Sequence, residues 1–111
     1  MSFIAGDFLI FQLESGFGLM RVLEVEQNEN GDSIWHISAY EDLFFDVELA
    51  DSALETYENL KVAIAHVALT NRAFESTQVS KMSNKPLQES ELAELENWKQ
   101  NPNREIVDRS I

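Results

Sequence analysis

The side chains of this chain that could do acid, base or metal chemistry are two histidines and a total of 20 carboxylates. His36 and His66 lie far apart in the sequence and form no pair at helical ligand spacing. A Zn²⁺ site would need them to converge in space with carboxylates, because imidazole nitrogens and carboxylate oxygens are the ligands available for that ion. Each histidine instead falls in an apolar stretch, which is typical of a packed or half-buried side chain. We therefore expect no metal site and no cofactor.

Three carboxylates, Asp42, Asp46 and Glu48, lie close enough in the sequence to suggest hydrolase chemistry. Paired carboxylates can hold Mg²⁺ or divide the acid and base roles of a hydrolase. Asp46 and Glu48 would point the same way from a strand predicted over residues 43–49, but the alternation of that segment places them on its solvent side. A solvated acidic stripe is the simpler interpretation, so a carboxylate-based hydrolase is the least favoured function.

Other catalytic motifs are absent from the sequence. Cysteine is missing, which excludes a disulfide framework, a thiolate nucleophile and a cysteine metal site. The tripeptide Glu14-Ser15-Gly16 is an ordinary turn rather than a Gly-x-Ser-x-Gly elbow, and no Gly-Lys pair follows Gly16-Phe17-Gly18 to bind phosphate. We expect a protein that is not an enzyme.

Trp35 has two interpretations. It alternates with Ile37 and Ala39, and large aromatic residues in such patterns commonly fill small cores, so core packing is the default. If exposed, it would lie among carboxylates and could anchor a basic partner, because aromatic side chains dominate interface energetics. The candidate partner-binding residues are accordingly Trp35, Glu41, Asp42, Asp46 and Glu48.

The formal net charge of −12 belongs entirely to the first half of the chain. Residues 1–58 contain 13 acids and one base, and 1 − 13 = −12, whereas residues 59–111 contain seven acids and seven bases. Such a field repels nucleic acid and anionic membranes, and it attracts a basic protein. We expect neither nucleic acid nor a membrane as a partner; solubility alone is the simpler explanation of the acidity, and steering of a basic partner is the functional one.

Arg21 is the one base among those acids. A lone cation in acidic surroundings is more often paired with a carboxylate for structural reasons than used in an active site. We expect Arg21 to be buried against a carboxylate such as Glu24 or Asp7.

Strands are predicted over the first half of the chain, where apolar runs are separated by turn residues. The segments Gly6–Leu13, Phe17–Gln27 and Ser33–Tyr40 have strand length and composition. The apolar side of the second segment changes part way along, which predicts a bulge or a strong bend near residues 18–21. A fourth strand is predicted over Leu43–Leu49. Its dry face would consist of Phe45, Val47 and Leu49.

Helix signals begin after these strands. Ser52 and Glu55 have the spacing of a capping box, which predicts a helix to about Leu60. Residues 61–70 fit either a strand or a continuation of this helix, and β-branched residues favour the strand. Residues 70–85 are polar and irregular. A clear amphipathic helix is predicted over Glu89–Gln100, with Leu92, Leu95 and Trp98 as its apolar stripe.

These elements predict a small α+β domain over residues 1–103, followed by a flexible tail over residues 104–111. The antiparallel strands would form a partly open barrel or a meander, with one short helix and the C-terminal amphipathic helix. No stretch resembles a signal peptide or reaches the length of a membrane helix, so we expect a cytoplasmic protein.

The first quarter of the chain resembles a known family. Gly6-Asp7 enters an apolar strand, and Gly16-Phe17-Gly18-Leu19-Met20-Arg21-Val22-Leu23 leads a glycine-rich turn into a second strand. This pattern is similar to the start of the SH3-like barrels of the polymorphic-toxin immunity protein 26 family. The resemblance implies a small immunity or antitoxin-like protein that neutralises a partner and is not an enzyme.

The sequence therefore favours a non-enzymatic acidic protein that binds a basic protein partner. The alternative is a structural or homo-oligomerising domain, in which an edge strand or the terminal helix pairs with a second copy.

Overall fold

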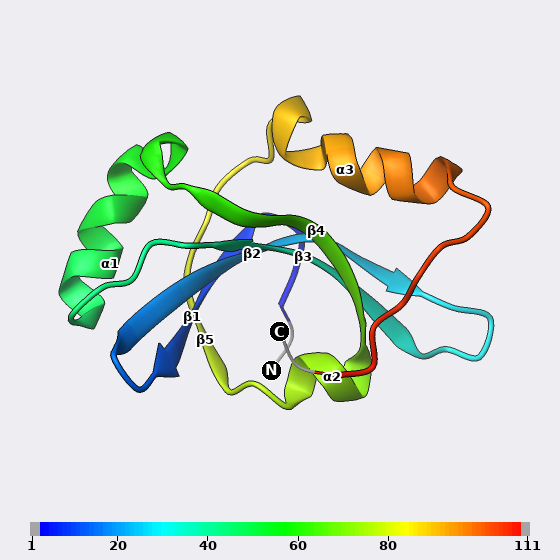
Figure 1. Ribbon diagram of the computed structural model, residues 1–111, viewed down its shortest axis with the longest axis horizontal. Coiled ribbons are helices and arrows are strands. Elements are labelled where there is room, and N and C mark those ends of the chain that lie inside the picture. The colour runs from blue at the N-terminus through cyan, green and yellow to red at the C-terminus, as the bar shows by residue number, and fades with distance from the viewer. Residues whose placement is uncertain (1–2, 110–111) are drawn as a thin grey trace.

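One antiparallel sheet of five strands organises the protein, and the computed structural model describes residues 3–109 (Figure 1). The strand order is β4-β3-β2-β1-β5, and the sheet is not closed. The α+β class and the antiparallel sheet are thus confirmed. In chain order, the elements are β1 (Asp7–Leu13), β2 (Gly16–Gln27), β3 (Ser33–Tyr40), α1 (Val47–Ala53), the 3₁₀ helix η1 (Leu54–Asn59), β4 (Val62–Thr70), α2 (Asn71–Glu75), β5 (Val79–Asn84) and α3 (Glu89–Gln100).

The first four strands form a meander, and β5 adds to its free edge beside β1. Short turns of polar residues and glycine join β1 to β2 and β2 to β3, as the sequence predicts. The expected bulge in β2 exists, but it lies further along the strand, between Val22 and Glu24 in the pairing with β3. The bulge changes which residues of β2 face each side, so Glu24 pairs with His36.

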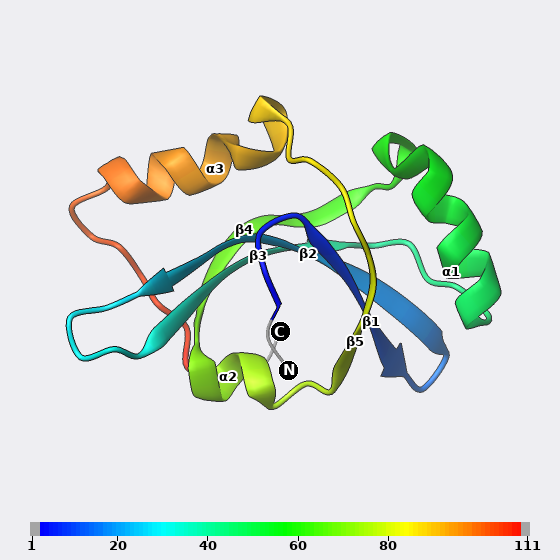
Figure 2. The same cartoon turned by 180° about the vertical axis from the view of Figure 1, so that it is seen from behind.

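Both faces of the sheet are covered, because alternate residues of the central strands are apolar on each side. α2 lies on one side and α3 on the other, as Figures 1 and 2 show from opposite directions. The face toward α2 holds the larger core: Leu9, Met20, Val22, Trp35, Ile37 and Leu69 pack with Ala73 and Phe74. On the opposite face Phe8, Ile10 and Leu19 pack with Ala50 and Leu54.

The segment predicted as a fourth strand is the largest difference from the sequence prediction. Residues 43–49 do not form a strand; α1 begins at Val47, and its N-cap Asp46 accepts a hydrogen bond from the backbone N–H of Leu49 at 2.9 Å. The place beside β3 that a strand here would need is taken by β4. The expected dry face does not exist, because Phe45, Val47 and Leu49 are all exposed.

The helix expected from Ser52 is also misplaced. The α-helix ends at Ala53, close to where the capping box predicted its start, and the 3₁₀ helix η1 follows it. The reason is that Asp46 supplies an earlier cap, from which Ala50 and Leu54 fall one helical turn apart on the buried side.

The second half of the chain follows the prediction more closely. Residues 62–70 are the favoured strand, and α3 spans Glu89–Gln100 with Leu95 buried. The polar stretch 70–85, expected to be irregular, contains α2 and β5. No helix within residues 3–109 is long and apolar enough to cross a membrane.

The segment after α3 contacts the sheet. Val107 forms a parallel bridge with Leu69, and its carbonyl accepts from the N–H of Thr70 at 3.0 Å. Arg72 and Asp108 form an ion pair at the same place. Residues 110 and 111 of the expected tail lie outside the described residues.

Candidate functional site

All four predicted partner-binding carboxylates lie in one continuous stretch, residues 41–60, which we call the acidic segment. It joins β3 to β4 and contains α1 and η1, at one end of the sheet (Figure 1). The stretch holds no lysine or arginine. Its acids are Glu41, Asp42, Asp46, Glu48, Asp51, Glu55 and Glu58. None of the ion pairs found among residues 3–109 involves any of these carboxylates.

Trp35 is not part of this surface. It is buried, stacks on the ring of Phe74 at 3.9 Å between centroids, and donates Nε1–H to Oδ1 of Asn71 at 2.9 Å. Core packing, the default interpretation, is therefore confirmed. Trp35 lies near the start of β3 and Glu41 follows its end, so about 20 Å of strand separate them. The structure does not bring Trp35 to the four carboxylates.

Asp42 and Asp46 hold the backbone of the acidic segment. Oδ1 of Asp42 accepts from the N–H of Lys61 at 2.7 Å and ties the two ends of the segment together. Asp46 caps α1, and Glu48 lies in the first turn of α1, where the helix dipole favours a negative charge. These positions give the carboxylates structural roles, with Asp46 and Glu48 exposed and Asp42 partly buried.

The acidic segment also exposes large apolar side chains, which the sequence prediction missed. Phe45 is 85% exposed, and three neighbours of similar character, Leu43, Val47 and Leu49, are also exposed. The alternation of these residues resembled a strand, so they were expected in a core. The available signal was Asp46, an N-cap residue type in the middle of the pattern. The result is an apolar patch among carboxylates.

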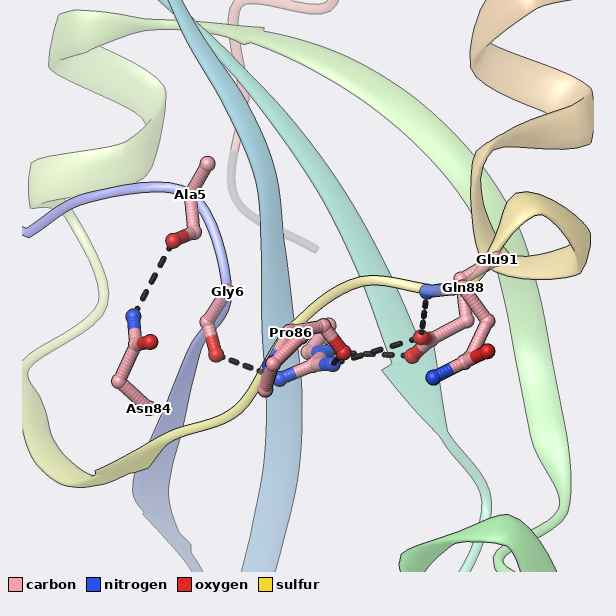
Figure 3. Close-up of polar contacts among 7 residues, drawn as sticks. Ala5, Gly6, Asn84, Pro86, Gln88 and Glu91 are labelled. Carbon is pink, nitrogen blue, oxygen red and sulfur yellow. Dashed lines mark hydrogen bonds and ion pairs between the residues drawn. The ribbon is translucent and has the colours of Figure 1, made fainter.

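Arg21 is buried as expected, but its partner is Glu91. The guanidinium forms a two-point contact with that carboxylate, with Nε to Oε1 at 3.1 Å and Nη2 to Oε2 at 3.3 Å. It also donates to the carbonyls of Gly6 and Pro86, which Figure 3 shows converging with Glu91. The ring of Phe8 lies 4.0 Å beneath it. These contacts make Arg21 a structural cation that joins β2 to the chain entering α3.

The two histidines meet on the sheet face beneath α3. His36 is fully buried, and its Nδ1 lies 3.0 Å from Nε2 of His66 while its Nε2 lies 2.7 Å from Oε1 of Glu26. Burial, and secondly the neighbouring His36, lower the pKa of His66 to about 4, so His66 is neutral at pH 7. Packed histidines were expected, but their contact was not. The only sequence signal of this contact was the alternation along β3, which places His36 and Trp35 on different faces of the strand.

The glycines that carry the resemblance to the immunity protein 26 family have a structural reason in this chain. A Cβ on Gly16 would lie 2.5 Å from the carbonyl oxygen of Phe44, and one on Gly18 would meet the ring of Phe11 at 2.6 Å. The close approach of the acidic segment therefore requires a glycine at position 16, whereas a side chain at position 18 would have to displace the ring of Phe11. The family resemblance itself stays a prediction. Comparisons of the chain with protein-family models, with curated proteins and with solved structures found no match.

Proposed function

We propose that this chain is a non-enzymatic binding protein that docks onto a basic protein through its acidic segment, residues 41–60. The observation that supports this best is the side chain of Phe45, which is 85% exposed among carboxylates that no lysine or arginine of the described residues pairs with. Protein interfaces combine an apolar centre with a polar rim, and a few aromatic anchors contribute most of the binding energy. The acidic segment has both parts.

The charge of the segment selects the kind of partner. Seven acids repel nucleic acid and anionic lipid, and they attract a surface rich in lysine and arginine. A second copy is a poor partner for this surface, because a two-fold symmetric contact would place the same acids opposite each other. The occupant that fits is a basic protein with an apolar pocket for Phe45.

The resemblance of the first quarter to the immunity protein 26 family adds a direction to this proposal. A protein of that kind binds its partner in order to neutralise it. The acidic segment would then cover a basic surface that the partner needs for its own activity. A purified partner should lose its activity at a one-to-one ratio with this protein.

The test compares how strongly the wild-type protein and two variants bind the same captured protein. Immobilised wild-type protein should retain a basic protein from native lysate at low salt and release it at high salt, because screening weakens contacts between exposed charges. The Phe45→Ser variant should bind that protein at least about tenfold more weakly. Leu13→Ser is the matched control, because Leu13 is an exposed apolar residue outside the acidic segment. Equal binding by Phe45→Ser and wild type would refute the proposal.

One feature favours a second candidate, self-association through the sheet. β4 is an edge strand, and Val107 pairs only near its Leu69 end. Val62, near the other end of β4, is 52% exposed. An open edge can pair with a strand of another chain. A dimer in sedimentation velocity at micromolar concentration would favour this candidate, and a monomer would remove it.

A further inference from the structure

The cluster around His36 has the composition of a metal site. Three neighbouring strands contribute to it: β2 supplies Glu24 and Glu26, β3 supplies His36, and β4 supplies His66. The register explains the convergence, because Glu24 is paired directly with His36 across β2 and β3. The ligand atoms of Glu24, Glu26 and His36 all lie within 4.8 Å of one another. A single ion at about 2.0 to 2.2 Å from each is compatible with this spacing after small side-chain movements.

The surroundings of His36 suit an imidazole that binds a metal ion. A metal-binding histidine usually donates its second ring N–H to an acceptor, which orients the ring. With its hydrogen on Nδ1, His36 donates to Nε2 of His66 at 3.0 Å and leaves Nε2 available on the side of Glu26. The ring of Trp98 covers His36 edge-on at 4.8 Å, whereas the side chains of Glu24 and Glu26 are each 35% exposed. The cluster is thus rigid at the histidine and open to solvent at the carboxylates.

Lys99 places a cation of the protein itself at these carboxylates. Its Nζ lies 2.8 Å from Oε1 of Glu24, so the two groups form an ion pair. Lys99 stands at the end of α3 with an exposed, flexible side chain, so it can withdraw when another cation arrives. The carboxylate that pairs with Lys99 is then available for an ion with higher charge.

We propose that Glu24, Glu26 and His36 bind a divalent first-row transition metal ion such as Zn²⁺, that His66 positions His36, and that the ion displaces Lys99. The imidazole ligand favours such an ion over Mg²⁺ or Ca²⁺, which prefer oxygen ligands only. Three protein ligands leave at least one position for water or a partner side chain. This site is separate from the acidic segment, and the proposal does not depend on the one made for that segment.

The test is calorimetric titration of the purified protein with Zn²⁺ at physiological ionic strength, where diffuse attraction to exposed acids is screened beyond about 8 Å. One Zn²⁺ should bind per chain, and Mg²⁺ should bind at least about tenfold more weakly. Glu26→Gln should weaken Zn²⁺ binding by at least about tenfold. Glu29→Gln is its control, because Glu29 is an exposed acid in the turn after β2.

Lys99→Met gives a second, opposite readout that does not depend on losing a ligand. Removal of the competing ammonium group should tighten Zn²⁺ binding by about tenfold. Lys61→Met changes the net charge equally outside the cluster and should leave the affinity nearly unchanged. Binding that is equal in Glu26→Gln and Glu29→Gln, or that is not tightened more by Lys99→Met than by Lys61→Met, would overturn the proposal, as would the absence of Zn²⁺ binding.

His66 is tested as a positioning residue. His66→Phe keeps a ring beside Trp98 but removes the acceptor, and it should weaken Zn²⁺ binding by about 10- to 100-fold. His66→Gln retains an acceptor in its amide oxygen and should recover most of the affinity. If both variants bind Zn²⁺ as wild type does, His66 has no positioning role and that part of the proposal fails.

Discussion

At the scale of single residues, Arg21 shows how this small domain uses a buried charge. The guanidinium contacts Glu91 from far along the chain and the carbonyls of Gly6 and Pro86, so it fixes the path of the chain between β5 and α3. Burial of an ion pair adds little net stability, but removal of one partner leaves an uncompensated charge. The sequence predicted the burial of Arg21 but not its partner, since Glu91 is brought to it only by the long-range path of the chain.

Glu91→Gln should therefore destabilise the protein strongly. The guanidinium would keep its buried position without a counter-charge, which costs about 3 kcal/mol of unfolding free energy for a largely buried pair. Glu89→Gln, at an exposed acid in the same first turn of α3, should cost less than about 1 kcal/mol. Urea denaturation of the two variants measures the difference. Equal costs would show that Arg21 does not depend on Glu91.

Asp7 should make the stability depend on acid. Burial alone would raise the pKa of this carboxyl, but hydrogen bonds from Asn84 and Ile4 and the nearby Lys81 outweigh it and hold the pKa below its ordinary value of 3.8. Because the folded-state pKa is the lower one, the contribution of Asp7 is complete above the unfolded-state pKa and is lost as the pH falls through the folded-state value.

Wild-type protein should thus lose unfolding free energy from about pH 5 downward more steeply than Asp7→Asn does. Urea titrations across this range check the slopes, with Asp32→Asn, at an exposed turn residue, as the control. Parallel slopes for wild type and Asp7→Asn would contradict the role given to Asp7.

At the scale of elements, the segment between β3 and β4 was the hardest to predict. Phe45, Val47 and Leu49 alternate with acids as a half-buried strand does, and Ser52 with Glu55 has the spacing of a capping box. Both patterns are present in the sequence, but the structure forms neither a strand over residues 43–49 nor a helix that starts at Ser52. A strand over residues 43–49 would have to pair with the free edge of β3, and β4 already occupies that edge. The pairing depends on tertiary structure and cannot be read from the segment itself.

The position of the cap gives a direct test of this element. Asp46→Ala should destabilise the protein by about 1 kcal/mol, because the N–H of Leu49 loses its acceptor. Ser52→Ala should have almost no effect, since Ser52 lies inside α1 and alanine is a good helix former. Thermal or urea denaturation distinguishes the two. The reverse order of effects would restore the capping box predicted at Ser52.

The other elements show where sequence patterns suffice. α3 was predicted at about its observed bounds because acids in its first turn and a stop signal after it bound an amphipathic pattern, and its Leu95 is buried as its stripe requires. α2 and β5 were missed for the opposite reason. α2 has five residues, and β5 is a polar strand that exists because β1 offers it an edge. Short elements of this kind are stabilised by contacts that no local pattern encodes.

At the scale of the whole molecule, the fold redistributes the charge that the sequence separates into two halves. Bases of the second half neutralise acids of the sheet, as Lys81 does for Asp7 and Lys99 for Glu24. The ion pairs among the described residues leave out the acidic segment, where the negative field is consequently concentrated. The charge split could be predicted from the sequence. The exposure of Phe45 within the acidic part could not, because it depends on α1.

The most direct test of the proposed function is hydrogen exchange in the protein alone and in complex with the basic protein that it captures. Docking through the acidic segment predicts slower exchange of backbone amides over residues 43–58 in the complex, with α2 unchanged, because α2 lies away from the acidic segment (Figure 1). Protection confined to α2, with residues 43–58 exchanging as in the protein alone, would contradict the proposal.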